Sequence, residues 1–385
     1  MKNLRILIAH SAYLLRGGED MVVDSEIALL RSNGHEVAEY RRDNSDIAGM
    51  SKIGLAANTL WSQRTVQDLD RLITEFKPDV IHAHNTLPLI SPSLYWAAER
   101  AGVPVVQTLH NFRQMCLSAM FLRDGKVCED CLGHLPWRGV TRKCYRGSAI
   151  QSAVMAGMLV LHRGLGTYTH KVARFIALND FSRGKFIEGG LPAGRIVVKP
   201  NFVDIPAGSN GVRKGALYVG RLSAEKGIDV LVRAMCHLPA CQLHVIGSGP
   251  EEPVLYLCEN INKLGFMQRE QIVSHMQSAS YLLLPSICYE NFPLTLVEAF
   301  ACGLPVIASR IGAMAVLIED GKTGLLFEPG SAKDLAKKIE WAETHPEIML
   351  EMGKNARKEY EEKYTPEHNI RQLIHIYNGV IGTRT

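Results

Sequence analysis

The chain has 385 residues, of which 46% are hydrophobic and 21% charged, and its formal net charge is +4. This composition is typical of a globular protein, excludes disordered and coiled-coil chains, and the length suits two domains. No apolar run approaches the roughly 20 residues that span a bilayer, and the first residues resemble a strand more than a cleaved signal. We therefore expect a cytoplasmic protein.

The charge is unevenly distributed along the chain. Residues 101–200 carry a net charge of +9, whereas residues 1–100 carry −2 and residues 201–385 carry −3. A local basic excess indicates an anionic partner, such as a phosphorylated substrate or the lipid surface of the inner membrane, or only a solvated face. Peripheral contact with an anionic membrane at its cytoplasmic face therefore stays open.

The first half of the chain alternates strand and helix patterns. Residues 4–9 form a continuous apolar run, which predicts a buried strand of a parallel sheet. Gly17 and Gly18 follow it and precede a segment with helical periodicity, so the turn lets the backbone approach a ligand closely. Such alternation predicts a doubly wound α/β fold.

Histidines end two later strands of this half. His82 and His84 end the strand in PDVIHAHN, and His110 ends the strand in VPVVQTLH. Ligands of parallel sheets bind at the carboxyl ends of the strands, so each histidine is a candidate site residue, although each can also be a core residue.

Residues 112–147 interrupt the alternation with a basic segment that contains four of the nine cysteines: Cys116, Cys128, Cys131 and Cys144. Four thiolates in one loop suit a tetrahedral structural zinc, and the alternative is a set of buried thiols. A disulfide framework is not expected in the cytoplasm.

The apolar segment at residues 148–163 is too short for a membrane span and is flanked by basic residues. It predicts a helix that is either buried in the core, which we favour, or placed on an anionic lipid surface. Residues 206–215 are rich in Gly, Pro and Ser without apolar periodicity, and they predict a linker.

The stretch Tyr281–Ser309 predicts a strand, a loop, a helix, a turn and a second strand. Glu290 lies in the loop and Glu298 inside the apolar helix, where a carboxylate is costly to bury without hydrogen bonds. Pro293 fits the first helical turn, and the free N–H groups there favour a phosphate. These residues indicate a ligand that carries both hydroxyl and phosphate groups.

Two further turns fit the same ligand. Arg221 and Lys226 bracket a strand-to-helix turn in GRLSAEKG, where two cations beside a helix start can clamp a phosphate. Gly247 and Gly249 follow the next strand, which is a weak signal when taken alone.

Several of these motifs resemble those of family-four retaining glycosyltransferases of the GT-B fold. They are GRLSAEKG, the seven-residue spacing between Glu290 and Glu298, the preceding LPS and the following ACGLPVI. The resemblance implies an α/β protein with two Rossmann-like, doubly wound domains that face each other across a cleft. It also implies that Glu290 holds the hydroxyls of the donor sugar and that Glu298 holds the ribose.

The resemblance assigns roles to the remaining candidates. His110 faces the site of sugar transfer, so Glu290 and His110 are the expected catalytic residues. The expected donor-binding residues are Gly17, Gly18, Arg221, Lys226, Gly247, Gly249, Phe266, Asn291, Phe292, Pro293, Leu294 and Glu298. The domains are expected to comprise residues 1–205, joined by a returning C-terminal helix at 366–385, and residues 206–365.

The expected activity is transfer of a sugar, with retention, from a UDP- or GDP-sugar to a hydroxyl of a saccharide or lipid-linked acceptor. The resemblance places this activity in the assembly of a bacterial polysaccharide or glycolipid. The only Asp-x-Asp motif, at Asp68 and Asp70, lies in a predicted helix. We therefore expect catalysis without a divalent cation or other cofactor.

Two other functions remain open at this point. A nucleotide-sugar epimerase would use the same cleft without an acceptor. A nucleic-acid-binding protein would use the basic cysteine-rich segment, but that segment lacks interleaved aromatic residues, so we do not expect a nucleic-acid partner. A Rossmann dehydrogenase is excluded because no G-x-G-x-x-G follows the first strand.

Overall fold

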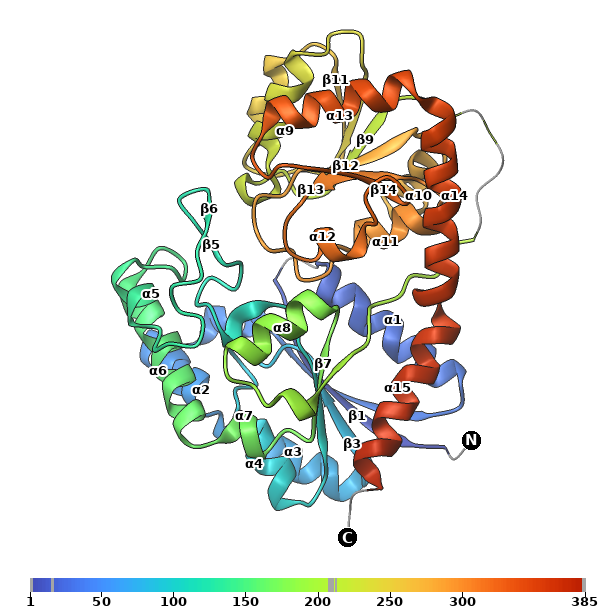
Figure 1. Cartoon of the computed structure of the whole chain (residues 1–385). Coiled ribbons are helices and arrows are strands. Elements are labelled where there is room, and N and C mark those ends of the chain that lie inside the picture. Colours follow the sequence, from blue (N-terminus) through green and yellow to red (C-terminus); the bar gives the residue numbers. More distant parts are fainter. Residues whose placement is uncertain (1–2, 15–16, 207–210, 212, 383–385) are drawn as a thin grey trace. The chain divides into compact units, whose positions relative to one another are not determined.

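The computed structural model describes residues 3–14, 17–206, 211 and 213–382, which form two compact units (Figure 1). Unit 1 comprises Met1–Met120, Glu129–Lys199 and Asn369–Thr385, and unit 2 comprises Phe121–Cys128 and Pro200–His368. The first unit thus ends before the expected residue 205. Part of the cysteine-rich insertion groups with unit 2, and not with the first domain as expected. Residues 207–210 and 212 of the predicted linker lie outside the described residues.

Unit 1 is built on a six-stranded parallel sheet with the strand order β2-β1-β3-β4-β7-β8. The strands are β1 (Arg5–Ala12), β2 (Glu36–Asp43), β3 (Val80–Ala83), β4 (Val105–Thr108), β7 (Arg174–Ala177) and β8 (Ile196–Val198). The order reverses between β1 and β3, and ligands of open α/β sheets bind outside the carboxyl ends of the strands at such a point.

Helices connect these strands. They are α1 (Gly18–Ser32), α2 (Lys52–Leu60), α3 (Gln63–Phe76), α4 (Ser93–Arg100), α5 (Trp137–Thr141), α6 (Ala149–Gly164), α7 (Thr167–His170), α8 (Asp180–Glu188) and α15 (Pro366–Ile381). On one side of the sheet, α1 and α15 bury their apolar faces in a shared core. The C-terminal helix therefore packs in unit 1, and residues 383–385 of its predicted range lie outside the described residues.

Unit 2 has its own six-stranded parallel sheet, in the order β11-β10-β9-β12-β13-β14. The strands are β9 (Ala216–Val219), β10 (Leu243–Ile246), β11 (Ile261–Gly265), β12 (Tyr281–Leu284), β13 (Val306–Ser309) and β14 (Gly324–Phe327). This is the Rossmann strand order, and its reversal lies between β9 and β12.

The helices of unit 2 are α9 (Ile228–Cys236), α10 (Arg269–Ser278), α11 (Leu294–Ala301), α12 (Met314–Leu317), α13 (Ala332–Thr344) and α14 (Pro346–Lys363). Short 3₁₀ turns in the two units are η1 (Asn44–Gly49), η2 (Phe112–Gln114), η3 (Ala193–Arg195), η4 (Ala224–Lys226) and η5 (Glu252–Leu257). The strand, helix and strand predicted within Tyr281–Ser309 are β12, α11 and β13. Gly303 ends α11 in the left-handed region, with φ of 63°.

The cysteine-rich insertion contains the hairpin of β5 (Leu122–Arg123) and β6 (Lys126–Val127), followed by α5. Cys116, Cys128, Cys131 and Cys144 are all partly exposed. Among the residues that the structure describes, no three of these sulfurs lie within 4.8 Å of one another. The structural zinc stays a prediction. A disulfide instead joins Cys236 and Cys258 of unit 2, which the sequence did not indicate.

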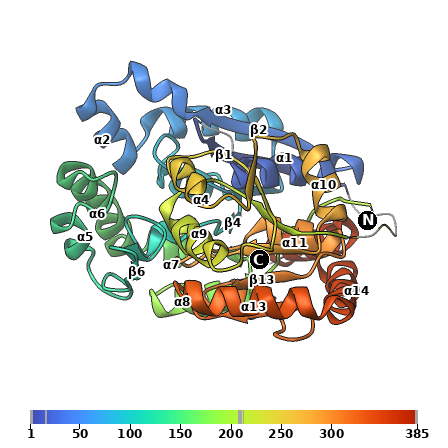
Figure 2. The ribbon, with the colours of Figure 1, turned by 90° about the horizontal axis from the view of Figure 1, so that it is seen from above.

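The apolar helix predicted after the insertion is α6, which lies beside α2 and α5 in unit 1 (Figure 2). Met155, Met158 and Leu159 are buried in a small core, whereas Ile150 is 79% exposed. The helix is therefore only partly a core element. Within the described part of the chain, no helix has the length and apolar character that a membrane crossing requires.

A buried charged cluster ties α1 and α15 to the sheet of unit 1. The Glu26 carboxylate on α1 lies 3.1 Å from the Lys199 ammonium and 3.0 Å from Nδ1 of His82. Lys199 also donates to the Asn369 side chain, and the Tyr377 hydroxyl lies 2.7 Å from the same His82 nitrogen. Lys199 is only 1% exposed, so the pair shares one sealed interior site.

The charge state of this cluster is set by its internal partners. Burial alone would raise the pKa of Glu26, but the positive charge of Lys199 and the imidazole of His82 outweigh it and hold that pKa well below its usual value. Glu26 therefore stabilises the fold above the unfolded-state pKa of about 4.3, and this stabilisation is lost as the pH falls toward the folded-state pKa.

Replacing Glu26 with Gln is expected to lower the free energy of unfolding by about 3–5 kcal/mol, because Lys199 then keeps a buried charge without its carboxylate. Urea unfolding followed by circular dichroism measures it. The deficit should be complete above about pH 5 and shrink below it, where Glu26 of the unfolded wild-type chain takes up a proton and the stabilising contribution of the carboxylate falls. Glu351→Gln, which removes an exposed partner of Lys354, is the matched control and should change stability by less than about 0.5 kcal/mol. Equal stability of E26Q and wild type at pH 7 would contradict this role.

Candidate active site

In unit 2, the candidate residues gather at the reversal of strand order between β9 and β12. Lys226 lies on η4 after β9, and Glu290 lies in the loop after β12. The Lys226 ammonium is 2.6 Å from a carboxylate oxygen of Glu290, which also accepts a 2.7 Å hydrogen bond from the Ser286 hydroxyl. The two loops that follow neighbouring strands are thus joined by one ion pair.

The ion pair fixes the charges of both partners. Burial by itself would raise the pKa of Glu290, but the adjacent Lys226 ammonium and the Ser286 hydroxyl lower it below the usual range. Burial would lower the pKa of Lys226, and the Glu290 carboxylate raises it instead. At neutral pH the site therefore holds a carboxylate and an ammonium side by side, and the exposed Arg221 adds a second cation after β9.

Glycines let the loops of this site approach one another. Gly247 adopts a φ of 135°, and a side chain there would collide with the carbonyl of Gly220. A side chain at Gly249 would collide with the carbonyl of Leu222 in the loop that leads to Lys226. Both positions therefore require glycine for the packing of the β9 and β10 ends, independently of any ligand.

Helix α11 begins at this edge of the sheet. Pro293 is its N-cap, Asn291 and Phe292 are buried just before it, and Leu294 is its first residue. Burial raises the pKa of Glu298 on this helix, although the charge of Arg269 lowers it in part. No hydrogen bond to the Glu298 carboxyl group is present among the described residues. This group can therefore accept hydrogen bonds from a ligand. Phe266, expected near the base, is 76% exposed after β11.

In unit 1, the glycine turn after β1 leads into α1. The backbone N–H of Gly17 donates to the Asp20 side chain at 2.9 Å, and the other oxygen of Asp20 lies 2.9 Å from Nε2 of His10. Gly17 has an ordinary φ of −123°, and a Cβ there would meet no atom within 4 Å. The fold itself does not require a glycine here, so the open space beside it suits close approach of a ligand. Gly18 starts α1 and is exposed.

His110 lies in a recess beside this turn, lined also by Glu19, Asn111 and Arg113. Its Nε2 atom is 2.8 Å from Nδ1 of His84, which in turn lies 3.5 Å from Glu26 through Nε2. Burial is the main cause that lowers the pKa of His110 well below its usual value, and the neighbouring His84 lowers it further. Burial likewise lowers the pKa of His84 to about 3. Both rings are neutral at pH 7, so His110 acts through hydrogen bonds and not through a positive charge.

His82 and His84 are thereby placed in the interior as supports of the recess. Together with Glu26 they form the one group in the described part of the chain whose ligand atoms lie within 4.8 Å of one another. Lys199 already neutralises Glu26, Tyr377 and Thr108 hydrogen-bond His82, and His110 engages His84. The cluster is therefore largely satisfied within the protein, although Oε1 of Glu26 and Nε2 of His84, which lie 3.5 Å apart, form no hydrogen bond among the described residues.

Glu19 is the residue that sequence reasoning missed. Its carboxyl accepts hydrogen bonds from the Tyr13 hydroxyl at 3.0 Å and from the Asn111 amide at 3.4 Å. Burial raises its pKa to about 7, although the bond from Tyr13 opposes the shift. A carboxyl group that titrates near neutral pH beside His110 can exchange a proton with a ligand hydroxyl. Only its position directly after the glycine pair could have suggested it.

Two family models together match most of the chain. "Glycosyl transferase 4-like domain" matches residues 17–201, and "Glycosyl transferases group 1" matches residues 206–359. The chain therefore belongs to the glycosyltransferases, in the group that combines these two domains. Its two parallel-sheet α/β units are those of the GT-B fold.

Curated relatives agree with this assignment. The α-D-kanosaminyltransferase of Streptomyces kanamyceticus is 31% identical over 43% of this chain and 45% of its own length. The putative colanic acid biosynthesis glycosyltransferase WcaL of Salmonella typhimurium is 24% identical over 92% of this chain and 95% of its own length. The chain matches about half the length of some of these curated relatives, the α-D-kanosaminyltransferase among them.

Solved structures share the fold. Sucrose-phosphate synthase from Thermosynechococcus elongatus superposes with a TM-score of 0.73 at 20% identity, covering 98% of this chain and 99% of that one. Anabaena Alr3699/HepE, crystallised in complex with UDP-glucose, superposes with a TM-score of 0.67 at 18% identity over 98% of this chain and all of its own. These likenesses establish the architecture of the chain.

The titration of Glu19 yields a stability prediction. Because burial raises its pKa, Glu19 stabilises the fold while protonated, and this contribution is lost as the pH rises through about 7. The melting temperature of Glu19→Gln should therefore rise relative to that of the wild type as the pH is raised from 5 to 8. Thermal unfolding at both pH values measures the difference, with the exposed Glu36→Gln as control. A Glu19→Gln shift that is equal at pH 5 and pH 8 would refute the elevated pKa.

Proposed function

We propose that the chain transfers a sugar, with retention of configuration, from a UDP- or GDP-sugar to a hydroxyl of a saccharide or lipid-linked acceptor. The observation that carries this proposal is the constellation of Lys226, Glu290 and Glu298 at the reversal of strand order in unit 2. It combines a cation for a diphosphate, a charged carboxylate for sugar hydroxyls, and a carboxyl group that no described residue hydrogen-bonds.

The chemistry follows from the charges of these groups. The bond between the anomeric carbon and the diphosphate oxygen breaks, and the diphosphate leaves with the electron pair. Lys226, Arg221 and the free N–H groups at the start of α11 are placed to stabilise this negative charge before it develops. Glu290 is held as a carboxylate by Lys226 and orients the sugar through its hydroxyls.

The acceptor hydroxyl forms the new bond to the anomeric carbon and loses its proton. We assign the handling of this hydroxyl to the recess of unit 1, where neutral His110 offers a hydrogen bond. Glu19, whose pKa is about 7, can take up the proton there. Gly17 and Gly18 leave open backbone beside this recess for the phosphate-bearing ligand.

No divalent cation is needed in this scheme, because cationic side chains serve the diphosphate. The two acids of the Asp-x-Asp motif are engaged in other contacts on α3. Asp70 lies 2.6 Å from Arg100, and Asp68 lies 3.6 Å from Arg64.

We place the activity in bacterial polysaccharide or glycolipid assembly, in the cytoplasm at an anionic membrane surface, in keeping with the basic stretch of residues 101–200. HepE, crystallised in complex with UDP-glucose, supports the donor class, and WcaL, a putative colanic acid biosynthesis glycosyltransferase, supports the process.

Glu290→Ala is expected to abolish sugar transfer, because the variant loses both the group that orients the sugar and the carboxylate that holds Lys226. Transfer is measured by mass spectrometry of saccharide or lipid-linked acceptors incubated with UDP- and GDP-sugars, and circular dichroism checks the fold. Glu340→Gln, on the exposed face of α13, is the control and should retain full activity. Full activity of E290A would remove the basis of the proposal, and a new sugar isomer formed without acceptor would identify an epimerase.

Glu298→Gln tests the nucleotide half of the site. Loss of this acceptor for ribose hydroxyls should raise the Kd of UDP or GDP roughly tenfold at most, since a hydrogen bond contributes about 0.5–1.5 kcal/mol. Isothermal titration calorimetry measures the Kd, again with Glu340→Gln as control. An unchanged Kd in E298Q would show that the ribose is held elsewhere.

A further inference from the structure

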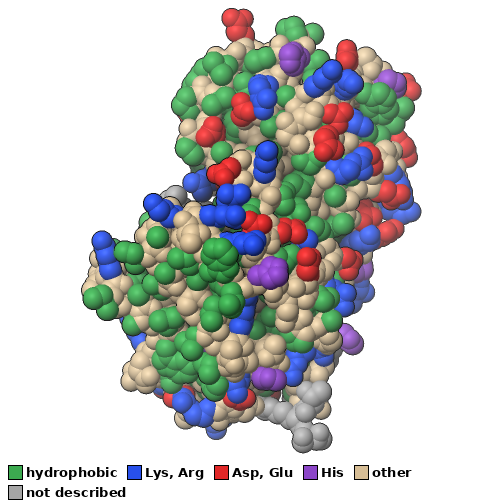
Figure 3. Space-filling view, turned by 60° about the vertical axis from the view of Figure 1, so that its left-hand side comes forward, with side chains coloured by type: hydrophobic (Ala, Val, Ile, Leu, Met, Phe, Trp, Pro, Cys, Tyr) green, Lys and Arg blue, Asp and Glu red, His purple; other side chains and the backbone are tan. Residues whose placement is uncertain are grey.

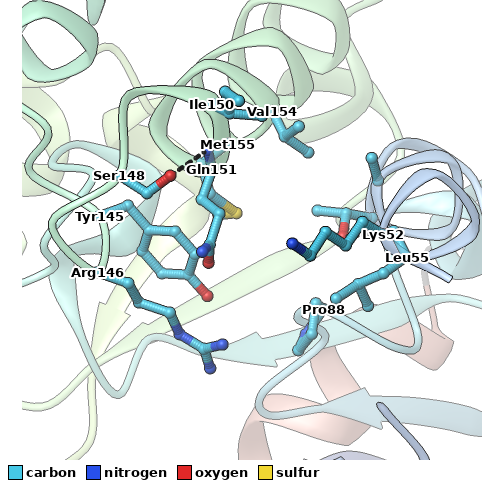
Figure 4. A pocket seen from close by; sticks show the side chains of 12 residues that line it. Lys52, Leu55, Pro88, Tyr145, Arg146, Ser148, Ile150, Gln151, Val154 and Met155 are labelled. Atoms are coloured by element: carbon cyan, nitrogen blue, oxygen red, sulfur yellow. Dashed lines mark hydrogen bonds between the residues drawn. The ribbon is translucent and has the colours of Figure 1, made fainter. Parts of the chain in front are cut away.

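A cavity of about 320 Å³ in unit 1 lies between α2 and α6, and the residues that line it differ from those that line the recess of His110 (Figure 4). Leu55, Ala56 and Thr59 of α2 line one wall, and Ile150, Val154 and Met155 of α6 line the other. Pro88, which follows β3, closes one end. The interior is thus largely aliphatic, and the Thr59 hydroxyl is satisfied by the carbonyl of Leu55 at 2.8 Å.

The walls of this cavity are firmly held. His162 on α6 lies 2.9 Å from the Leu60 carbonyl at the end of α2, and its ring stacks on Trp61 at 6.4 Å. The Asn58 side chain of α2 donates to the carbonyls of Pro88 and Leu89 at 3.0 and 2.9 Å. The cavity is therefore a property of packed elements, which is what a pre-formed ligand site requires.

The mouth of the cavity carries hydrogen-bond donors and cations. The side chains of Lys52, Tyr145, Arg146 and Gln151 lie around it in Figure 4, with the Lys52 ammonium and the Tyr145 hydroxyl directed toward its centre. No acidic residue lines the cavity. Lys52 and Arg146 form no ion pair with any residue that the structure describes; the Arg146 guanidinium lies only over the Tyr145 ring, at 5.4 Å. In the described part of the chain, these two cations therefore share the mouth without a counter-ion.

The backbone also contributes positive charge at the mouth of the cavity. Both α2 and α6 begin at the mouth, and neither has an acidic residue in its first turn. Helix starts carry partial positive charge and favour an anion. On the face shown in Figure 3, hydrophobic and basic side chains lie close together over unit 1, and Ile150 at the rim is 79% exposed. The site is therefore apolar within and cationic at its opening.

We infer that this cavity binds an amphipathic anion, with an aliphatic chain between α2 and α6 and a phosphate group at Lys52 and Arg146. An inorganic ion would leave the apolar interior unused, and an uncharged chain would leave both cations without a partner. The ligand class is a lipid phosphate, whose chain can come from an isoprenoid or from a fatty acyl group. The site is separate from the donor residues of unit 2, and the inference does not depend on the proposed transfer.

The test uses alkyl phosphates titrated into the full-length protein by calorimetry, below the concentrations at which they form micelles. Octyl phosphate should bind at least tenfold more tightly than octyl glucoside, which lacks the charge, and than inorganic phosphate, which lacks the chain. Lengthening the chain from hexyl to octyl phosphate should lower the Kd by roughly fourfold per methylene, the equivalent of ~0.8 kcal/mol, until the cavity is filled.

Variants separate the two halves of the site. The double variant Lys52→Gln and Arg146→Gln should weaken octyl phosphate at least tenfold and leave octyl glucoside unchanged. Ala56→Trp, which fills the interior, should weaken both ligands, and Lys337→Gln on α13 is the matched surface control. Melting curves check that each variant is folded, and Val154→Phe replaces Ala56→Trp if that protein is unstable.

Clear outcomes overturn the inference. It fails if octyl phosphate shows no saturable binding, if inorganic phosphate binds equally well, or if both cavity-filling variants bind octyl phosphate like the wild type. Comparing geranyl phosphate with decyl phosphate then distinguishes the sources, because a branched isoprenoid and a linear chain with the same number of carbons fill the cavity differently. Tighter binding of either one supports the site and assigns its natural ligand class.

Discussion

The ion pair between Lys226 and Glu290 is the contact on which the candidate site of unit 2 depends. It joins the loops after β9 and β12, the two strands between which the order of the sheet reverses. A parallel sheet delivers both loops to the same edge, and the reversal leaves a crevice between them that neither connection covers. The pair holds a carboxylate and an ammonium side by side, which are the charge states that the proposed transfer requires.

In unit 1, the candidate residues are positioned by a buried cluster of polar and charged side chains. Glu26 neutralises Lys199 and supports His82 and His84, and His84 in turn holds His110 at the edge of the recess. The position of His110 therefore depends on buried residues of α1, β3 and α15, such as Glu26, His82 and Tyr377, that do not line the recess. The result is a neutral imidazole beside a carboxyl group with a pKa of about 7.

Prediction from the sequence was most successful where local pattern and motif coincide. The strand, helix and strand around Glu290 are found almost as expected, because apolar periodicity, Pro293 and Gly303 mark their limits. The GT-B architecture followed from a resemblance that the family models confirm. The extent of the domains was less predictable. The hairpin at residues 121–128 belongs to unit 2, and α6 is exposed on one face, because both depend on contacts that periodicity does not encode.

By itself, the sequence determined the alternation of strands and helices, the fold class and the side chains that follow each strand, since these depend on local hydrophobic pattern and turn chemistry. Only the tertiary structure decided which of those side chains meet. Residues 64 positions apart form the Lys226–Glu290 pair, and Tyr377 reaches His82 across most of the chain. Helices α2 and α6 enclose a cavity whose two cations form no ion pair with any described residue. Charge states and cavities arise from burial and proximity in space, which spacing along the chain does not specify.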